Sequence, residues 1–294
     1  MPELPDIAIY LERLDALSGR QPLEQLHVLN PFILRSVDPT PAELSGRVVT
    51  GFRRIGKRIV IEVDGDMFIV IHLMIAGRLK WRDGGGKLAR GHNLAAFDFP
   101  AGRLLLTEAG SSRRASIHLA RGVDALAQFD RGGIEPLDAT LEEFAQRVRI
   151  ENHTLKRSLT DPRLFSGIGN AYSDEILHRA RLSPIAHSTK LTDDEIKRLF
   201  QATRTTLIEW TDRTRAEVGD GFPEKVTAFR EGMAVHGRFG EPCPDCGSPV
   251  QRIRYASNET NYCARCQTGG RLLADRALSR LLGKDWPRSI DEVE

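Results

Sequence analysis

Four cysteines near the C-terminus constrain the fold of this chain more than any other feature. Two Cys-x2-Cys pairs, Cys243/Cys246 and Cys263/Cys266, are separated by sixteen residues. Each pair can hold one edge of a tetrahedral zinc ion while the residues between them form a hairpin. Because four thiolates complete the zinc shell, we predict one structural zinc ion rather than a catalytic one. Disulfide-bonded or free cysteines are the alternative interpretation.

The residues between the two cysteine pairs favour a basic ribbon. Residues 250–255 and 261–262 have strand-like composition, and residues 243–282 carry six arginines against three acidic residues. Such a ribbon can enter a nucleic-acid groove, but zinc ribbons also bind proteins. The spacing alone leaves both interpretations open.

The length and charge of the chain limit the remaining classes. At about 150 residues per domain, 294 residues suggest two domains with cores of their own. With 42 basic and 40 acidic residues, the net charge of +2 is too balanced to indicate a polyanionic partner by itself. No apolar run approaches the ~18 residues of a membrane span, and the N-terminus does not resemble a secretory signal. We therefore expect a cytoplasmic protein without membrane contact.

The first part of the chain predicts a helix followed by an antiparallel β-sandwich or barrel. Apolar residues recur at helical spacing over residues 5–18. From residue 48 to about residue 106, short β-rich runs separated by turn signals replace this pattern. The expected strands are Arg58–Val63, Met67–Leu73, Leu79–Trp81, Leu94–Phe99 and Arg103–Thr107.

Helical patterns begin after Gly132 and Gly133, where we predict a domain boundary. Residues 214–232 contain glycine and proline with little apolar periodicity, which predicts a long mobile loop. A third, small unit that bears the cysteines follows from about residue 237. The expected helices are Leu141–Val148, Leu155–Leu159, Ala171–Arg181 and Asp193–Ile208.

A glycine-rich segment precedes one of these helices. In Gly167-Ile168-Gly169-Asn170, the glycines would let phosphate oxygens approach backbone N–H groups at the positive end of the helix dipole. Asn170 can either cap the helix or donate its amide to a phosphate. Lys156, fourteen residues upstream, either faces the same phosphates or is an ordinary solvated lysine.

The N-terminus offers a nucleophile. Removal of Met1 would leave Pro2 as a secondary amine, and an α-amino group titrates near ~8, well below the ~10.4 of lysine. Such an amine can attack a sugar C1′ and form an iminium, while the adjacent Glu3 moves protons. The alternative is a frayed terminus. Lys57 has the parity of the apolar strand residues that follow it, so we expect it on the apolar face, either reaching solvent or gripping a phosphate.

In this order, the N-terminal Pro-Glu-Leu-Pro, the strand lysine, the Gly-Ile-Gly-Asn segment and the four-cysteine finger resemble the formamidopyrimidine-DNA glycosylase and endonuclease VIII family over nearly the whole chain. The resemblance implies an α+β protein with a catalytic β-sandwich domain over 1–132 and a helix-two-turns-helix domain over 133–236. A zinc finger and tail over 237–294 complete it, with damaged DNA in the cleft between the lobes. It further implies a monomeric, nucleoid-associated glycosylase and abasic-site lyase.

The resemblance also assigns roles to individual residues. It implies that Pro2 forms the Schiff base, that Glu3 shuttles protons and that Lys57 grips a phosphate. The DNA contacts that it implies are His72, Met74, Ile75, Arg113, Arg114, Lys156, Gly169, Asn170 and Asn258, and the zinc ligands are Cys243, Cys246, Cys263 and Cys266.

Three positions depart from the family pattern. Ile75 stands where family members usually carry a methionine wedge, with Met74 beside it; Ala115 stands where an aromatic wedge is usual; and Asn258 replaces the finger arginine. Flipping a nucleotide costs a few kcal/mol, which wedge residues partly offset. The alternative is therefore a non-catalytic or lyase-only protein that binds damaged or unusual nucleic acid.

Overall fold

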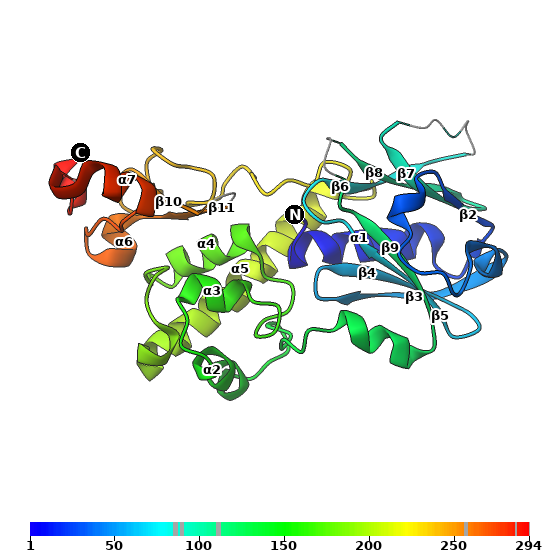
Figure 1. The fold of residues 1–294 in the computed structure, drawn as a ribbon, viewed down its shortest axis with the longest axis horizontal. Helices are drawn as coiled ribbons and strands as arrows, with labels where there is room; N and C mark the ends of the chain where they lie inside the picture. Colours follow the sequence, from blue (N-terminus) through cyan, green and yellow to red (C-terminus); the bar gives the residue numbers. More distant parts are fainter. Residues whose placement is uncertain (85–87, 89–90, 110–112, 256–257, 286, 294) are drawn as a thin grey trace. The chain divides into compact units, whose positions relative to one another are not determined.

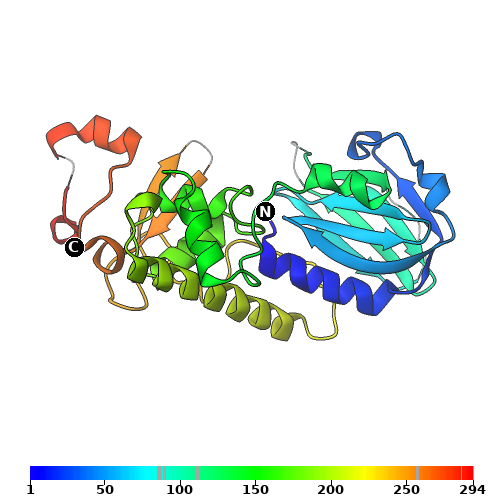
Figure 2. The ribbon, with the colours of Figure 1, turned by 90° about the horizontal axis from the view of Figure 1, so that it is seen from below.

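The computed structural model describes residues 1–294 except 85–87, 89–90, 110–112, 256–257, 286 and 294. The chain divides into two compact units (Figures 1 and 2). Unit 1 contains Met1–Arg131 and Trp210–Thr227, and unit 2 contains Gly132–Glu209 and Ala228–Glu294. Among the described residues, no helix is both long enough and apolar enough to cross a membrane.

Unit 1 is the expected antiparallel β-sandwich, with helix α1 (Leu4–Ser18) packed against it (Figure 2). One sheet has the strand order β1-β3-β4-β5-β9 and the other β2-β7-β8-β6. Short 3-10 helices are η1 (Pro31–Ile33), η2 (Pro41–Leu44) and η3 (Val123–Phe129). The strands are β1 (Pro22–Leu23), β2 (Gln25–Val28), β3 (Arg47–Ile55), β4 (Arg58–Val63), β5 (Met67–His72), β6 (Gly77–Arg82), β7 (Asn93–Phe99), β8 (Gly102–Glu108) and β9 (Ser116–Arg121).

The core of unit 1 lies between the two sheets. Alternate residues of β4 and β5, such as Ile61 and Ile69, meet residues of the other sheet, such as Phe97, and all three are fully buried. The opposite face of the five-stranded sheet carries a second, smaller apolar cluster, which η3 covers. Because both faces of β5 are covered, it is a continuous apolar run rather than an alternating one.

The sequence-based strand list missed β1 and β9 at the borders of one sheet, β2 at a border of the other, and the interior strand β3, whose residues are mostly half-buried without a clear alternation. β9, with the sequence Ser-Ile-His-Leu-Ala-Arg, alternates clearly but lies beyond the last expected strand, and β1 and β2 are too short to show a period. The expectation for Lys57 was also wrong. Ile55 pairs with Arg58, so Gly56 and Lys57 form the turn between β3 and β4, and Lys57 precedes the strand on whose face it was placed.

Unit 2 combines helices with a two-stranded ribbon (Figure 1). In its helical core, the ring centroid of Phe144 lies 4.8 Å from that of Phe165 and 5.4 Å from that of Phe200. Helix α4 packs against the second ribbon strand. The elements are α2 (Leu141–Arg149), α3 (Leu155–Thr160), α4 (Asn170–Arg179), η4 (Ser188–Lys190), α5 (Asp193–Val218, which continues into unit 1), β10 (Gln251–Tyr255), β11 (Asn258–Tyr262), α6 (Ala264–Thr268), α7 (Arg276–Leu282), η5 (Gly283–Asp285) and η6 (Ile290–Glu292).

The mobile loop predicted over 214–232 was wrong in its first part, because α5 continues to Val218. Trp210 and Thr214 are buried one helical turn apart, a spacing that the many charged residues around them obscure in the sequence. The residues that follow are packed rather than loose. Phe222 lies 5.7 Å from the ring of Tyr10, and Arg13 Nε donates to the carbonyl of Gly221 at 2.7 Å.

Candidate active site and nucleic-acid interface

Pro2 and Glu3 are buried where α1 begins. Glu3 is 3% exposed, and its backbone N–H donates to the carboxylate of Asp6 at 2.9 Å. Burial lowers the pKa of the Met1 amine below its usual value of about 8; the charges of Arg78 and Lys57 act in the same direction, and the carboxylates of Glu3 and Asp6 oppose them. The same buried surroundings at Pro2 would favour a neutral amine, the form that a nucleophile requires.

The half-buried Lys57 lies next to a neutral histidine. His72 ends β5 and pairs with Arg58 of β4. Burial, followed by the charges of Arg58 and Lys57, lowers the pKa of His72 to about 4. The imidazole is therefore uncharged at neutral pH and can donate a hydrogen bond without carrying a full charge.

The loop after His72 presents an apolar side chain to solvent. Met74 has a positive φ of 53°, and Ile75 is 62% exposed at the tip. The loop is closed by the Gly77 N–H, which donates to the Leu73 carbonyl at 2.9 Å, and by Arg78, which donates to the Ile75 carbonyl at 3.0 Å. Ile75 is thus held outward on a compact turn, and Met74 is half-buried beside it.

The loop before β9 holds two exposed arginines and a buried alanine. Arg113 donates to the Gly91 carbonyl at 3.0 Å, and Ala115 is 4% exposed. The carboxylate of Glu108 accepts the N–H groups of Arg114 and Ala115, at 2.9 and 3.0 Å. Sequence reasoning missed Glu108. The feature that could have identified it is an acidic residue at the end of a buried strand. Ser111 and Ser112 lie outside the described residues.

In unit 2 the structure brings Lys156 and Asn170 together. Lys156 Nζ donates to the Asn170 carbonyl and to Asp174 Oδ1, each at 2.6 Å, so it is not the solvated lysine of the alternative interpretation. Gly169, not Asn170, is the N-cap of α4, so capping by Asn170 was wrong. The Asn170 amide instead donates to the carbonyl of Glu259 on the ribbon at 3.0 Å.

Two buried acidic residues of α4 organise the surroundings of this pair and were missed from sequence. Asp174 Oδ2 accepts from His236 Nδ1 at 2.8 Å and from the Asn261 N–H at 3.2 Å. The Glu175 carboxylate accepts the N–H groups of residues 234, 235 and 236, at 2.7 to 2.9 Å. The available signal was an Asp-Glu pair directly before the apolar residues of an amphipathic helix.

The four cysteine thiols converge on one point. All four Sγ atoms lie within 4.8 Å of one another, with Cys246 and Cys263 at 3.4 Å and Cys243 and Cys266 at 3.9 Å. Ligand bonds of about 2.3 Å in a tetrahedron require separations of this size, so the residues fit zinc. The chain thus has a four-cysteine structural zinc site, and His178 Nε2 lies 3.2 Å from Cys243 Sγ.

Asn258 opens β11 at the tip of the ribbon, where its side chain is exposed. The strand begins three residues earlier than the sequence suggested. On the facing strand, the Arg252 guanidinium lies over the ring of Phe239, 4.0 Å from its centroid. The ribbon therefore presents arginines from β10 and a neutral amide from β11.

Family models match three consecutive parts of the chain. The formamidopyrimidine-DNA glycosylase N-terminal domain matches residues 1–115, the formamidopyrimidine-DNA glycosylase H2TH domain matches residues 133–216, and the zinc finger found in FPG and IleRS matches residues 240–269.

Individual relatives agree with these matches. The formamidopyrimidine-DNA glycosylase of Moorella thermoacetica is 31% identical over 262 residues, which cover 86% of this chain and 95% of the relative. An uncharacterized formamidopyrimidine-DNA glycosylase-like protein of Mycobacterium tuberculosis is 41% identical over 150 residues, 51% of this chain and 93% of that one. The crystal structure of the MutM (Fpg) protein from Thermus thermophilus superposes with a TM-score of 0.76 at 31% identity, covering 90% of this chain and 98% of that one.

Proposed function

Since this chain belongs to the formamidopyrimidine-DNA glycosylase family, we propose that it excises damaged bases from DNA and cleaves the strand at the resulting abasic site. One observation carries the proposal for this particular chain. Pro2 and Glu3 are buried together at the start of α1, and burial lowers the pKa of the Met1 amine that directly precedes them. A merely binding protein has no need of such an environment.

The chemistry begins once Met1 has been removed. The lone pair of the Pro2 nitrogen attacks C1′ of the damaged nucleotide, the bond from C1′ to the base breaks, and the base leaves with a proton. The ring C1′–O4′ bond opens and leaves an iminium between Pro2 and C1′. Loss of a C2′ proton then expels the 3′ phosphate, and water hydrolyses the iminium and restores the amine.

Glu3 is the proton carrier in this sequence. Its carboxyl group is buried directly beside the nucleophile, so it can protonate the departing base or the ring oxygen and later accept the C2′ proton. Burial keeps bulk water from competing for these transfers. Lys57 holds a phosphate close to the reacting sugar.

The other candidate residues position the DNA. Lys156 and Asn170 already lie together beside the N-cap Gly169, so a phosphate can accept from the lysine, the amide and a backbone N–H at the positive end of α4. In unit 1, Arg113 and Arg114 are exposed for phosphate contact, and Ile75 is the side chain that fills the space left by a flipped nucleotide. The zinc ion is structural and holds the ribbon that carries Asn258.

Borohydride trapping on abasic DNA tests the proposal. Reduction of the iminium should give a covalent protein–DNA adduct, and Pro2→Gly and Glu3→Gln should each lower its yield by at least about a hundredfold, a loss typical of removing a nucleophile or its proton carrier. Glu12→Gln, on an exposed turn of the same helix, is the matched control. A wild-type protein that forms no adduct, or an adduct that survives Pro2→Gly, contradicts the mechanism.

Two observations favour a narrower second function, the lyase step alone. Ala115 is buried and cannot stack on an orphaned base, and Asn258 offers the phosphates a neutral amide instead of a guanidinium. A substrate that already lacks its base needs less stacking on the orphaned base and a weaker hold on the phosphates. Trapping on abasic DNA without release of any damaged base would establish this narrower function, whereas DNA binding without trapping would indicate a binding protein.

A further inference from the structure

A row of basic side chains crosses the outer face of the five-stranded sheet of unit 1, at the end near Lys57. Arg58 of β4 pairs with His72 of β5, and His118 of β9 pairs with Val70. Because alternate residues of a strand share a face, His118 lies on the same face as Arg58 and His72. All three side chains are half-buried and reach the surface.

Two further arginines continue this row. Arg35 follows η1 and is held along the edge of β9, where its backbone N–H donates to the Ile117 carbonyl at 2.8 Å. Arg131 lies two residues beyond Phe129, whose carbonyl accepts from Arg58 Nη1 at 3.2 Å. We call Arg35, Arg58, His72, His118 and Arg131 the outer basic row.

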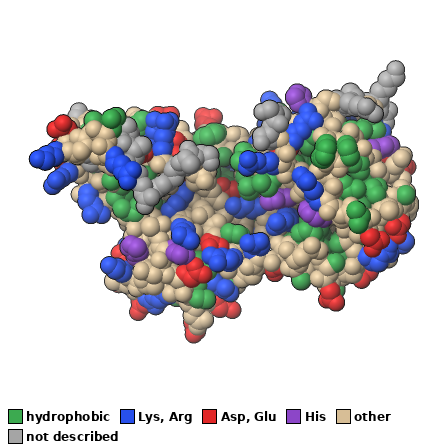
Figure 3. All heavy atoms as spheres, viewed as in Figure 1, with side chains coloured by type: hydrophobic (Ala, Val, Ile, Leu, Met, Phe, Trp, Pro, Cys, Tyr) green, Lys and Arg blue, Asp and Glu red, His purple; other side chains and the backbone are tan. Residues whose placement is uncertain are grey.

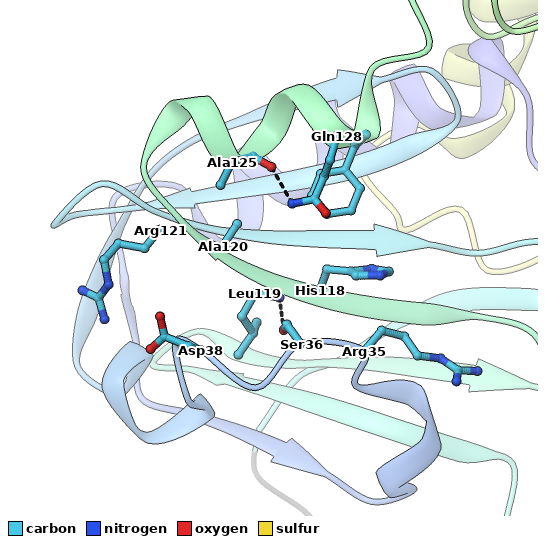
Figure 4. A pocket seen from close by; sticks show the side chains of 10 residues that line it. Arg35, Ser36, Asp38, His118, Leu119, Ala120, Arg121, Ala125 and Gln128 are labelled. Atoms are coloured by element: carbon cyan, nitrogen blue, oxygen red, sulfur yellow. Dashed lines mark hydrogen bonds between the residues drawn. The ribbon is translucent and has the colours of Figure 1, made fainter.

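A cavity of about 310 Å³ lies behind the row, between η3 and residues 35–38. Figure 4 shows Arg35 and His118 pointing in the same direction at one end of it, whereas Asp38 and Arg121 lie at the other end. Figure 3 shows Lys, Arg and His side chains gathered on this face of unit 1. Arg35 and His118 therefore line one end of the cavity with their side chains pointing the same way.

In the part of the chain that the structure describes, the outer basic row lacks the acidic partners that other arginines of this sheet have. Arg53, further along the same face, pairs with Glu62 at 2.6 Å, and Arg121 pairs with Glu43 at 2.5 Å. Within the described residues, neither Arg35 nor Arg131 has a carboxylate within 4 Å. Neighbouring cations without acidic partners repel one another, and an anion bound from outside relieves this repulsion.

The titration of the two histidines agrees with this geometry. Burial lowers the pKa of His118, and Arg58 and Arg35 lower it further. Burial likewise lowers the pKa of His72, with Arg58 and Lys57 adding to the effect. Each imidazole therefore experiences mainly positive neighbours.

The length of the row matches a nucleic-acid backbone. From β4 through β5 and β9 to residue 35 there are three steps of about 4.8 Å, or roughly 14 Å in all. One DNA strand advances about 3.4 Å per nucleotide along the axis, so the row spans about four nucleotides. A small anion would occupy only one of these positions.

We propose that Arg35, His118 and Arg131 extend the DNA-binding surface across the outer face of this sheet and hold phosphates of the duplex that flanks the damaged nucleotide. The choice of DNA as the ligand rests on the proposed function. The row begins at His72 and Lys57, and leads away from the reacting sugar. It contributes affinity and orientation, and no base specificity.

The salt dependence of binding to an undamaged duplex of about 25 base pairs tests this proposal without any chemistry at Pro2. Each phosphate contact contributes about −0.9 to the slope of log K against log salt. Arg35→Gln combined with Arg131→Gln should therefore make the slope less negative by about 1.8, measured by fluorescence anisotropy between about 50 and 200 mM salt. Arg121→Gln, at the other end of β9 and paired with Glu43, should leave the slope unchanged.

A double variant with the wild-type slope overturns the proposal, and so does an equal change in the Arg121→Gln control, which would indicate a general effect of net charge. Thermal unfolding of both variants at the wild-type temperature shows that the fold is intact. Borohydride trapping by the wild-type protein, measured in parallel, reports on the proposed function. An unchanged slope with trapping intact therefore refutes only the outer basic row.

Discussion

Lys156 and Asp174 form a buried ion pair in unit 2: Nζ lies 2.6 Å from Oδ1, and the Asp174 side chain is fully buried. The same carboxylate accepts from His236 and from the backbone of Asn261. One aspartate thus connects α3, α4, the segment before the zinc finger and the ribbon. Lys156 is held at a defined position before any phosphate arrives.

Asp174→Asn should destabilise unit 2 by about 3 kcal/mol, because removing one partner of a buried pair leaves an uncompensated charge. Urea unfolding at pH 7 would measure the loss. Arg179→Gln is the comparison, since Arg179 and Glu209 are both 40% exposed and such pairs contribute less than about 1 kcal/mol. Equal losses in the two variants would show that the buried pair has no special role.

Stability should fall in acid through His72. Its pKa is about 4 in the folded protein because of burial, against about 6.5 when unfolded. Between about pH 4 and about pH 6.5 the unfolded chain binds more protons at His72 than the folded protein does. The contribution of the neutral His72 to the free energy of unfolding is therefore complete above about pH 6.5 and is lost as the pH falls toward about 4. From pH 7 to pH 4.5 the wild-type protein should lose about 2 kcal/mol more than His72→Asn. Parallel losses in urea unfolding would contradict this assignment.

His178 should stabilise the zinc site through its contact with Cys243 at 3.2 Å. Hydrogen bonds to metal ligands orient them, and their loss typically costs roughly 10- to 100-fold in metal affinity. His178→Ala should therefore bind zinc at least about tenfold more weakly, as measured by competition with a chromophoric chelator. His187→Ala, an exposed histidine bonded to Asn152, is the control and should retain the wild-type affinity. Equal affinity in both variants would exclude the role.

Gly77 should tolerate no side chain. A Cβ at this position would lie 2.2 Å from the Leu73 carbonyl oxygen, which is backbone and cannot move aside freely. Gly77→Ala should cost about 1–3 kcal/mol and shift the loop that presents Ile75. In Gly51→Ala the new Cβ would meet only the flexible end of the Glu62 side chain, at 3.2 Å. This substitution should therefore lower the stability less than Gly77→Ala does. The two thermal midpoints, compared with the wild type, decide between these outcomes.

An N-terminal extension should abolish the proposed chemistry. Any residue before Pro2 turns its nitrogen into an amide, which has no basic lone pair for attack on C1′. A protein with an uncleavable N-terminal tag should give no borohydride adduct, whereas a C-terminal tag should have no effect. Mass spectrometry of the active protein should show that Met1 is absent. An extended protein that still forms the adduct would require a different nucleophile.

The elements with a clear period could be predicted, and those without one, such as the interior strand β3 and the short border strands β1 and β2, could not. Helix α1, the strands β4 to β8 and the cysteine cluster follow from apolar spacing and ligand spacing, which are local in the sequence. The end of α5 was missed because charged residues surround Trp210 and Thr214 and hide the buried positions. Lys57 was misplaced because the alternation of β4 was extended backwards to it in the sequence, whereas in the structure Gly56 and Lys57 form a turn that does not share this alternation.

The candidate site shows the same limit. Pro2, Glu3 and Lys156 could be proposed from the sequence because position or motif marks them. Asp174 and Glu175 were not found, since a buried carboxylate resembles any other acidic helix residue until its distant partners are known. Those partners lie about sixty residues further along the chain, beyond the range of local sequence patterns.

The three consecutive N–H groups that meet the Glu175 carboxylate also bear on how the finger is built. These hydrogen bonds fix the segment that leads into the finger without any contribution from zinc. The zinc ion orders the cysteine loops, whereas Glu175 of α4 fixes the position of residues 234–236. Removal of zinc should then disorder the cysteine loops, while residues 234–236 stay bonded to the Glu175 carboxylate. Zinc would then rebind to a finger whose first residues are already held in place by α4.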